Sequence, residues 1–376
     1  ASGSQILRRV VDRIADYLLT TNVQLGASYA VSQRAGERMQ EAQRRVVELV
    51  NAERPEEVVM GPTSTMLVQL LARAMEPQLG PGDEVVVTRA DHESNIGAWV
   101  RLASIGVVPR FWELNAATQR LELDDLERVM SPRTKLVAFT HTSNILGTIN
   151  PVAEWTRFVH DRGARVCVDG VAYAPHRAVD VRAWDVDYYV LSFYKVYGPH
   201  HAVLYGKYAH LLELANLYHY FIANDRIPYK LQPGNPNYEL SYGVIGIADY
   251  LAELGARAGA PAGASRRTQM EHAFSAIADH EAALADRLLT YLRTKPRVRV
   301  VGETTADQAV RVPTISFVAD GLDSRAIVQC IDEARIGIRY GDLHSRRLVE
   351  HLDLQRHGGV VRVSRVPSNT GEGIAR

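Results

Sequence analysis

Lys195 suggests covalent chemistry more clearly than any other residue of this chain. It lies in the segment Leu191-Ser-Phe-Tyr-Lys-Val-Tyr-Gly-Pro-His200, directly after an apolar run, in a chain whose basic residues are mostly arginine. An arginine stays protonated, whereas a desolvated lysine can lose its proton and bond covalently to an aldehyde. An ordinary surface lysine at the end of a strand is the competing interpretation, and the surrounding residues must decide between the two.

Two other segments place polar groups at the ends of predicted strands. Residues 61–65, Gly-Pro-Thr-Ser-Thr, stand between a short strand and a helix, where unpaired amides and the helix dipole favour an anion. A plain helix N-cap by Thr63 or Ser64 explains this pattern equally well. Asp169 closes the predicted strand 165–168, where it could pair with a pyridinium nitrogen or cap the next turn.

Further candidates follow other predicted strands. His92 could stack on an aromatic ring, or it could be a solvated loop histidine. Ser192 and Tyr194 could donate hydroxyl hydrogens to the same anion as residues 61–65. Arg339 and Arg362 lie in or beside strands of the C-terminal part, and each could bind a carboxylate with two hydrogen bonds or form a surface ion pair.

Strands and helices that must position these residues alternate along most of the chain. Two helical stretches are expected within residues 5–52, followed by helices at 64–75, from 95, and at 153–162. Strands are expected at 57–60, 84–87, 107–112, 135–139, 165–168, 186–191 and 202–205. Alternation with nearly continuous apolar strands predicts an α/β fold with a mostly parallel sheet covered on both faces.

A second, smaller unit is predicted after residue 257. Residues 255–265 are rich in glycine, alanine and proline and indicate a junction, and a long helix follows around residues 283–289. The rest of the chain suggests a helix at 324–334 and strands at 297–301, 314–318, 337–340 and 360–363. This mixture predicts an α+β domain.

Composition restricts the possible partners and the compartment. The formal net charge of +0 offers no basic face to nucleic acid, and no apolar run approaches the roughly 18 residues that a membrane span needs. Cys167 and Cys330 are too few for a disulfide framework, which favours the cytoplasm, and no signal-peptide core is expected at the start. We expect a small-molecule partner, and no metal site is predicted.

The ordered set of strand-end residues resembles the class V aminotransferase family, in its cysteine desulfurase-like and selenocysteine lyase-like branch. The hydroxyl-rich segment, the histidine, an asparagine, the aspartate and the lysine follow one another in the family's order. Matching segments are residues 61–65, 91–92, 142–148, 168–170, 192–199, 234–237 and 361–364. Each motif is weak alone, but together they extend over nearly the whole chain.

The resemblance implies a fold-type I pyridoxal 5′-phosphate enzyme, with a seven-stranded, mostly parallel large-domain sheet flanked by helices and a smaller α+β C-terminal domain. It implies a large cofactor-binding domain at residues 21–257 and a small domain at 258–376. Residues 1–20 are expected beside the small domain and the active-site entrance. The implied assembly is a homodimer with the active site at the subunit interface.

Roles carried over by position complete the expected site. The implied catalytic residues are Lys195, which bonds to the cofactor, Asp169, which holds the pyridine nitrogen, and His92, which stacks on the ring. Implied cofactor contacts include Thr63, Ser64, Thr65, Asn144, Ser192, Tyr194 and, in the partner's phosphate site, Asn235. Implied substrate contacts are Arg362, Arg339, Asn144 and His344.

Departures from the family pattern bear on the reaction. Desulfurases carry a nucleophilic cysteine shortly after an arginine of the small domain, whereas residues 339–345 here contain none, and His344 stands near that position. Cys330 is better explained by the apolar face of a predicted helix. A persulfide mechanism is disfavoured because it requires a thiolate. Ala172, Tyr194 and Asn235 also differ from the residues usual in the family.

These observations favour a carbon–sulfur lyase that acts on a cysteine S-conjugate by β-elimination, with secondary metabolism such as antibiotic biosynthesis as the expected context. Transamination, epimerisation, decarboxylation and oxidative deamination of an amino acid stay open, because all begin with the same bound substrate. A non-catalytic scaffold is an alternative of another class, but it needs neither Lys195 nor Asp169. The aromatic segment 217–222 could line the entrance or form a packing or dimer patch.

Overall fold

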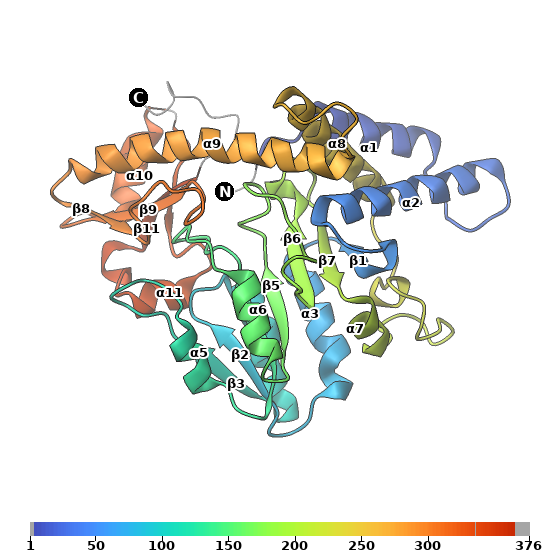
Figure 1. Ribbon diagram of the computed structural model, residues 1–376, viewed down its shortest axis with the longest axis horizontal. Coiled ribbons are helices and arrows are strands. Elements are labelled where there is room, and N and C mark those ends of the chain that lie inside the picture. The colour runs from blue at the N-terminus through green and yellow to red at the C-terminus, as the bar shows by residue number, and fades with distance from the viewer. Residues whose placement is uncertain (1–3, 335, 365–376) are drawn as a thin grey trace.

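The computed structural model describes residues 4–334 and 336–364, which form a large α/β unit and a smaller unit packed beside it (Figure 1). The large sheet has seven strands in the order β1-β7-β6-β5-β4-β2-β3. Its strands are β1 (Val58–Gly61), β2 (Glu84–Thr88), β3 (Val108–Trp112), β4 (Thr134–Thr140), β5 (Arg165–Asp169), β6 (Tyr188–Ser192) and β7 (Ala202–Gly206). Within this sheet β7 alone runs against the other strands. The mostly parallel sheet expected from the sequence is confirmed.

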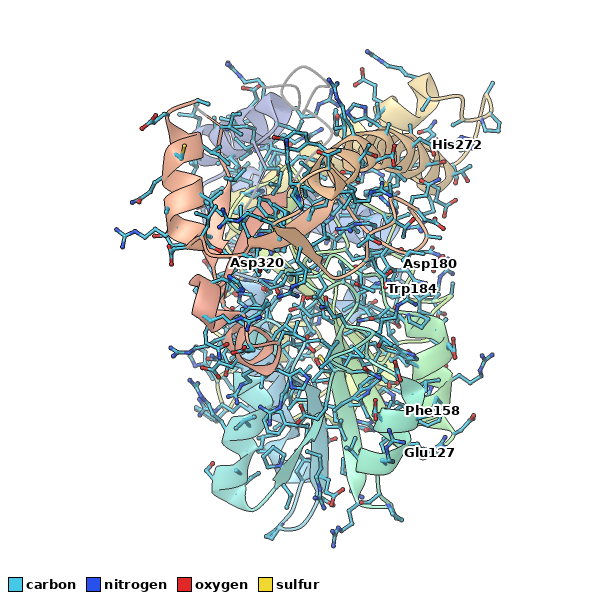
Figure 2. The ribbon with its side chains drawn as sticks, turned by 90° about the vertical axis from the view of Figure 1, so that its left-hand side faces the viewer. Glu127, Phe158, Asp180, Trp184, His272 and Asp320 are labelled. Carbon is cyan, nitrogen blue, oxygen red and sulfur yellow. The ribbon has the colours of Figure 1, made fainter. Side chains whose placement is uncertain are left out.

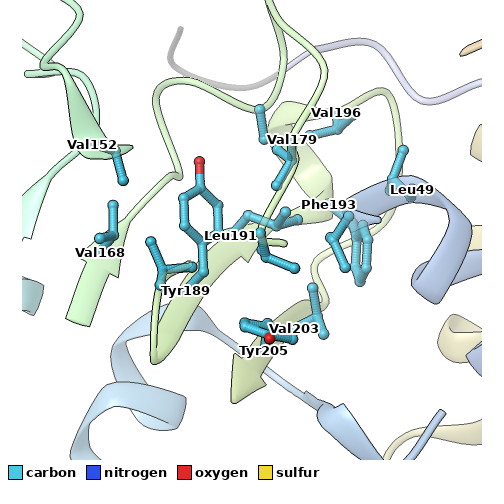
Figure 3. Packing of buried hydrophobic residues seen from close by; sticks show 14 of the residues in the cluster. Leu49, Val152, Val168, Val179, Tyr189, Leu191, Phe193, Val196, Val203 and Tyr205 are labelled. Atoms are coloured by element: carbon cyan, nitrogen blue, oxygen red, sulfur yellow. The ribbon is translucent and has the colours of Figure 1, made fainter. Parts of the chain in front are cut away.

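Helices cover both faces of this sheet, which explains why its central strands are apolar at nearly every position. One face packs against α2 (Ala30–Val50), α6 (Val152–His160) and α8 (Tyr238–Arg257), and Figure 3 shows part of this core around Tyr189, Leu191 and Val203. The other face packs against α3 (Ser64–Met75), α4 (Gly97–Val100) and α7 (Tyr208–Glu213). No helix in the described part of the chain is both long and apolar enough to cross a membrane.

The segment expected to be a helix from residue 95 is mostly irregular. A 3-10 turn (Glu93–Asn95), the four-residue α4 and a second 3-10 turn (Arg101–Ile105) replace it. The side chain of Asn95 donates to the buried Asp91 carboxylate at 3.0 Å, and Gly106 turns the chain at φ 89°. Side-chain bonds at the start and a left-handed glycine at the end leave little room for regular helix.

The smaller unit is a four-stranded antiparallel sheet with helices, in the strand order β10-β11-β9-β8. Its strands are β8 (Val298–Val301), β9 (Thr314–Ala319), β10 (Arg339–Gly341) and β11 (Val360–Ser364), and its short helices are α10 (Ser324–Asp332) and α11 (Arg346–His351). The α+β unit expected after the junction is therefore present.

The long helix α9 (Arg266–Arg293) joins the two units and runs across the top of Figure 1. Its first half contributes Met270, Phe274 and Ile277 to the core of the large unit, and its second half contributes Leu289 and Leu292 to the core of the small one. We propose that the domain boundary lies near residue 257, where α8 ends. Residues 1–3, 335 and 365–376 of the proposed ranges lie outside the described residues.

The N-terminal segment lies against the large unit. The helix α1 (Arg8–Thr20) packs on α8, where a Cβ at Gly246 would be 3.0 Å from the backbone nitrogen of Val10. Just before α1, the amide and hydroxyl of Ser4 both donate to the carbonyl of Tyr194, at 3.1 and 3.2 Å. The segment thus reaches the loop that carries Lys195.

Gly255 is expected to be essential to the packing of α8 on α9. A Cβ at this position would lie 1.6 Å from the carbonyl oxygen of Gln269, so the helices must separate to accept any side chain. Gly255→Ala should lower the free energy of unfolding by about 1–3 kcal/mol, as overpacking does elsewhere. Urea unfolding measures this. Gly80→Ala, whose Cβ would meet only a carboxylate oxygen at 3.9 Å, is the control, and equal midpoints for both variants would contradict the assignment.

Candidate active site

The ends of several strands of the large sheet meet at one edge. Strands β1, β4, β5 and β6 finish there, and the antiparallel β7 begins there, because Ala202 pairs with both Gly61 and Ser192. A cavity opens at this edge, as expected for an α/β sheet. The predicted residues that line it are Thr63, Ser64, Thr65, His92, Asn144, Asp169, Ser192, Tyr194 and Lys195, together with Thr140, Thr142, Ala172, His200 and His201.

Lys195 ends a 3-10 turn that follows β6, and its side chain is buried in the cavity wall. Burial lowers the pKa of its amine to about 8, with the charge of Arg362 acting in the same direction and Asp169 opposing both. At pH 7.5 roughly a quarter of such amines are neutral, against about one in a thousand at the ordinary pKa of 10.5. The surface-lysine interpretation is therefore wrong, and the amine is suited to attack a carbonyl carbon.

Hydrogen bonds to side-chain hydroxyls hold the loop that carries Lys195 in place. The Ser4 hydroxyl accepts the amide of Tyr197 at 2.7 Å, and Tyr197 has a left-handed backbone with φ 59°. The Tyr197 hydroxyl in turn donates to the carbonyl of Pro175 at 2.8 Å. These bonds stabilise a turn that a non-glycine residue seldom adopts.

Asp169 closes β5 and is buried at the bottom of the cavity. Its Oδ1 accepts the amide of Val171 at 2.8 Å, whereas its other oxygen has no donor within the described residues. Burial raises the pKa of the carboxyl, while the Val171 amide and Lys195 act in the opposite direction. One oxygen of Asp169 therefore caps the turn, and the other remains available to a ligand in the cavity. A pyridinium N–H is a suitable donor to that second oxygen.

Gly170 is required behind this carboxylate. A Cβ there would lie 2.1 Å from two ring carbons and the hydroxyl oxygen of Tyr189, and that hydroxyl is 3.0 Å from Nδ1 of His141. The His141 ring stacks on Tyr173 with their centres 3.5 Å apart. This aromatic packing fixes the backbone that carries Asp169.

Hydroxyl groups surround the start of α3. Thr63 is the N-cap, and its Oγ1 accepts the amide of Met66 at 3.1 Å, so the simple capping interpretation is correct. Its hydroxyl hydrogen is still available to a ligand. Ser192 donates to Ser64 at 3.1 Å, which brings β6 and α3 together. A helix start with several hydroxyls fits a phosphate group.

His92 is half-buried at the cavity wall rather than solvated. Its Nδ1 accepts the Ser94 amide at 3.1 Å, so its hydrogen resides on Nε2. Burial first, and then the charges of Lys195, His344 and Arg362, lower the pKa of His92 to about 4. The ring is neutral at physiological pH and suited to stacking on another heterocycle.

Asn144 joins the cavity to the small unit. Its Nδ2 donates to the carbonyl of Leu343 at 3.0 Å, its Oδ1 accepts the Ser345 hydroxyl at 2.7 Å, and its carbonyl accepts Nη1 of Arg362 at 3.0 Å. Both side-chain atoms of Asn144 thus hold the 343–345 loop. Arg362 is itself buried beside this contact.

The other predicted substrate residues lie around this contact without lining the cavity. The Arg339 side chain is exposed, but its Cα pairs with that of Arg362 across β10 and β11. His344 is exposed, with its ring centre 5.2 Å from that of His92. Leu343 and His344 both have left-handed backbones, at φ 51° and 63°, a strained geometry that often marks functional loops.

The explanation expected for Cys330 differs from the structure. Cys330 is exposed, because the buried stripe of α10 is formed by Ser324 and Val328, one turn apart. The apolar-face explanation for this cysteine is therefore wrong. Asn235, which is expected in the partner's phosphate site, does not line its own cavity and lies in a separate groove between α2 and the loop before α8.

Sequence reasoning missed His200 and His201. Both precede β7, and their place at the cavity follows from the antiparallel direction of that strand. The His201 Nε2 is 2.9 Å from the Ser241 hydroxyl, which itself donates to the carbonyl of Asn237. Two adjacent histidines after Gly198 and Pro199 stand out in the sequence, but nothing there indicates that they reach the cavity.

A buried reactive lysine, a buried carboxylate with a free oxygen and a hydroxyl-rich helix start are the groups that suit the aldehyde, the pyridine nitrogen and the phosphate of pyridoxal 5′-phosphate. Together with the sheet order, they define a fold-type I enzyme that depends on this cofactor. The chain belongs to the class V aminotransferase family, whose model, Aminotransferase class-V, matches residues 1–270 and 262–376. Family members use pyridoxal phosphate.

Individual relatives agree with this assignment. The chain is 40% identical to the aminotransferase-like protein FGM3 of Gibberella zeae, over all of this chain and 90% of that protein. It is 31% identical to the cysteine desulfurase-like protein ustD of Aspergillus flavus, over all of this chain and 83% of that protein. The apo cysteine desulfurase of Thermococcus onnurineus NA1 shares the fold, with a TM-score of 0.86, 24% identity and coverage of 100% and 90%.

Proposed function

We propose that this protein is a carbon–sulfur lyase that cleaves a cysteine S-conjugate into a thiol, pyruvate and ammonium. The observation that carries the proposal is a buried lysine and a buried arginine at one site whose neighbouring loop, residues 341–347, contains a histidine and no cysteine. When bound, pyridoxal phosphate supplies an electron sink that makes the α-carbon of an amino acid acidic.

Arg362 is suited to bind the α-carboxylate of the substrate. Burial, and then the charge of Arg339, lower its pKa to about 10, which leaves it protonated at neutral pH. Its Nη1 is anchored on the Asn144 carbonyl, beside the cavity. A guanidinium with further N–H groups can hold a carboxylate in a fixed orientation, which directs the α-carbon toward Lys195.

Lys195 and His344 are suited to move the two protons of an elimination. The neutral Nζ of Lys195 can accept the α-proton, because its pKa near 8 leaves a fraction of the amine unprotonated. The His344 imidazole, near His92 at the edge of the site, can donate a proton to the departing sulfur. Tyr340, 40% exposed on β10, is the second candidate donor.

No thiol is placed to take up the sulfur atom as a persulfide. Cys167 is buried within β5, where burial raises its pKa well above the ordinary range, and Cys330 is exposed on α10. Neither is among the residues that line the cavity. Release of the sulfur as a free thiol is therefore favoured over transfer to the protein.

Purified protein loaded with pyridoxal phosphate should release equal amounts of thiol and pyruvate from S-alkyl and S-aryl cysteines. A thiol reagent and lactate dehydrogenase measure the two products. Arg362→Gln should lower kcat/KM by about 10- to 100-fold, because the carboxylate loses its charged partner. Arg299→Gln on β8 is the matched control and should leave kcat/KM unchanged.

The products distinguish this proposal from other reactions of the same site. A keto acid with conversion of the cofactor to its amine form indicates transamination, carbon dioxide indicates decarboxylation, and the opposite enantiomer indicates epimerisation. Consumption of oxygen indicates oxidative deamination. Any of these products without thiol and pyruvate overturns the lyase proposal.

We also propose that the protein is a homodimer with Asn235 facing the partner's site. Asn235 lies outside its own cavity, in a groove lined by Gly36, Gln40 and Tyr229, with its Oδ1 3.4 Å from the Tyr218 hydroxyl. The adjacent Tyr220 and Phe221 are 98% and 68% exposed. Light scattering should give twice the chain mass, and a Tyr220→Ser/Phe221→Ser double variant should weaken association.

A further inference from the structure

His200 lies where the two hydroxyl-bearing segments of the cavity meet. It stands two residues before Ala202, whose Cα pairs with Gly61 of β1 on one side and with Ser192 of β6 on the other. The Thr63, Ser64 and Thr65 hydroxyls follow Gly61 directly. His200 lines the same cavity as all of them. The antiparallel direction of β7 therefore brings this imidazole to the phosphate end of the site.

Among the described residues that line the phosphate end, histidines are the candidates for a full positive charge besides Lys195. A phosphate monoester carries a charge of about −1.5 to −2 at pH 7, whereas the segments around it offer hydroxyls and a helix start. Among the lining residues that the structure describes, the basic ones are Lys195, His92, His200 and His201. The Lys195 amine is required by the aldehyde at the other end of the cofactor, which leaves the histidines to supply positive charge near the phosphate.

Two of the three histidines are held neutral. Burial lowers the pKa of His92 and of His201 to about 4. His201 is fixed further by Ser241: the Ser241 hydroxyl hydrogen goes to the carbonyl of Asn237 at 2.6 Å, so its oxygen must accept the Nε2–H of His201. That leaves Nδ1 of His201 as an acceptor, which repels a phosphate oxygen.

His200 differs from both in its surroundings. Its side chain is exposed, and its ring stacks on Tyr194, with ring centres 5.2 Å apart and planes inclined by 17°. No carboxylate among the described residues forms an ion pair with it. The Tyr194 ring thus holds a solvent-exposed imidazole next to the hydroxyl-rich start of α3.

We propose that His200 is a phosphate-binding residue of the cofactor site, and that Tyr194 is the platform that positions its ring. A ring N–H of His200 donates a hydrogen bond to a phosphate oxygen, and the dianionic phosphate favours the imidazolium form of the ring. The hydroxyls of the α3 start complete the cradle. This role concerns binding of the cofactor and does not depend on which reaction the loaded enzyme performs.

Cofactor binding to the apo-protein tests the assignment without any substrate. Apo-protein is titrated with pyridoxal phosphate and, separately, with pyridoxal, which carries the same aldehyde and ring but no phosphate. His200→Gln should raise the Kd for pyridoxal phosphate by roughly 10- to 100-fold, the range expected for a charge-assisted hydrogen bond. The Kd for pyridoxal should stay within about twofold of wild type. His200→Arg should restore most of the lost affinity, because it retains a positive charge.

A matched histidine control is available on the outer part of α9, where Figure 2 labels His272. His272→Gln should leave both dissociation constants unchanged. Equal weakening of both ligands by His200→Gln, or no weakening of pyridoxal phosphate, overturns the proposal. Unchanged pyridoxal affinity also shows that the variant is folded. Absence of lyase products would overturn the proposed function alone, since these titrations contain no amino acid.

Discussion

Lys195→Ala should abolish turnover, with kcat/KM at least about 10³-fold below wild type for any amino acid substrate. The variant loses both the covalent attachment of the cofactor and the base for the α-proton. Stability should not fall, because the lysine is buried without a hydrogen-bonded acid, and burial together with the charge of Arg362 lowers the pKa of its amine to about 8 although Asp169 opposes them. Product assays and thermal unfolding of wild type and variant measure the two effects.

The covalent attachment can be followed directly. Wild-type protein treated with pyridoxal phosphate and borohydride should carry a mass adduct on the peptide that contains Lys195, and Lys195→Ala should carry none. Lys135→Ala is the matched control, because Lys135 is 46% exposed and pairs with Asp83 at 3.6 Å. Attachment should become faster as pH rises and level off above about 8, as neutral amine accumulates. An adduct on another lysine would show that the site is assigned wrongly.

Strand positions could be predicted from the sequence because the central strands are buried on both faces. Each reads as an apolar run, and the polar residue that ends it, such as Asp169 or Ser192, marks the edge where ligands bind. The direction of a strand could not be predicted in the same way. Nothing local in residues 202–206 says that β7 runs against its neighbours, so His200 and His201 could not be placed at the cavity beforehand.

Contacts between the two units were also beyond sequence reasoning. Asn144 and Leu343 are separated by 199 positions, and so their hydrogen bond is decided by how the units pack. Gly170 and Tyr189 present the same problem within one sheet, because only the pairing of β5 with β6 brings the ring to the glycine. The helix predicted from residue 95 was wrong because side-chain hydrogen bonds replace backbone ones there, as the bond from Asn95 to Asp91 does before α4.

Asp169→Asn should lower kcat/KM by about 10²-fold or more while the cofactor stays attached to Lys195. The variant keeps the shape and the acceptor for the Val171 amide, so the turn after β5 should be preserved. What it loses is the negative charge that keeps the pyridine nitrogen protonated, and with it the electron-withdrawing strength of the ring. A protonated carboxyl would fail in the same way, and burial raises the pKa of this group. The positive charge of the bound pyridine must therefore favour the ionised form.

A second buried carboxylate, Asp187 at the opposite edge of the same sheet, provides a control that separates a loss of catalysis from a loss of stability. Asp187, just before β6, bonds His160, His210 and the Val166 amide, and these partners lower its pKa well below the ordinary value. Asp187→Asn should reduce stability at neutral pH, and that difference should disappear as the pH falls and the wild-type carboxyl becomes protonated. Its kcat/KM should stay near wild type. If Asp169→Asn instead lost stability with unchanged kcat/KM, Asp169 would be a structural turn residue and the pyridine-nitrogen assignment would be wrong.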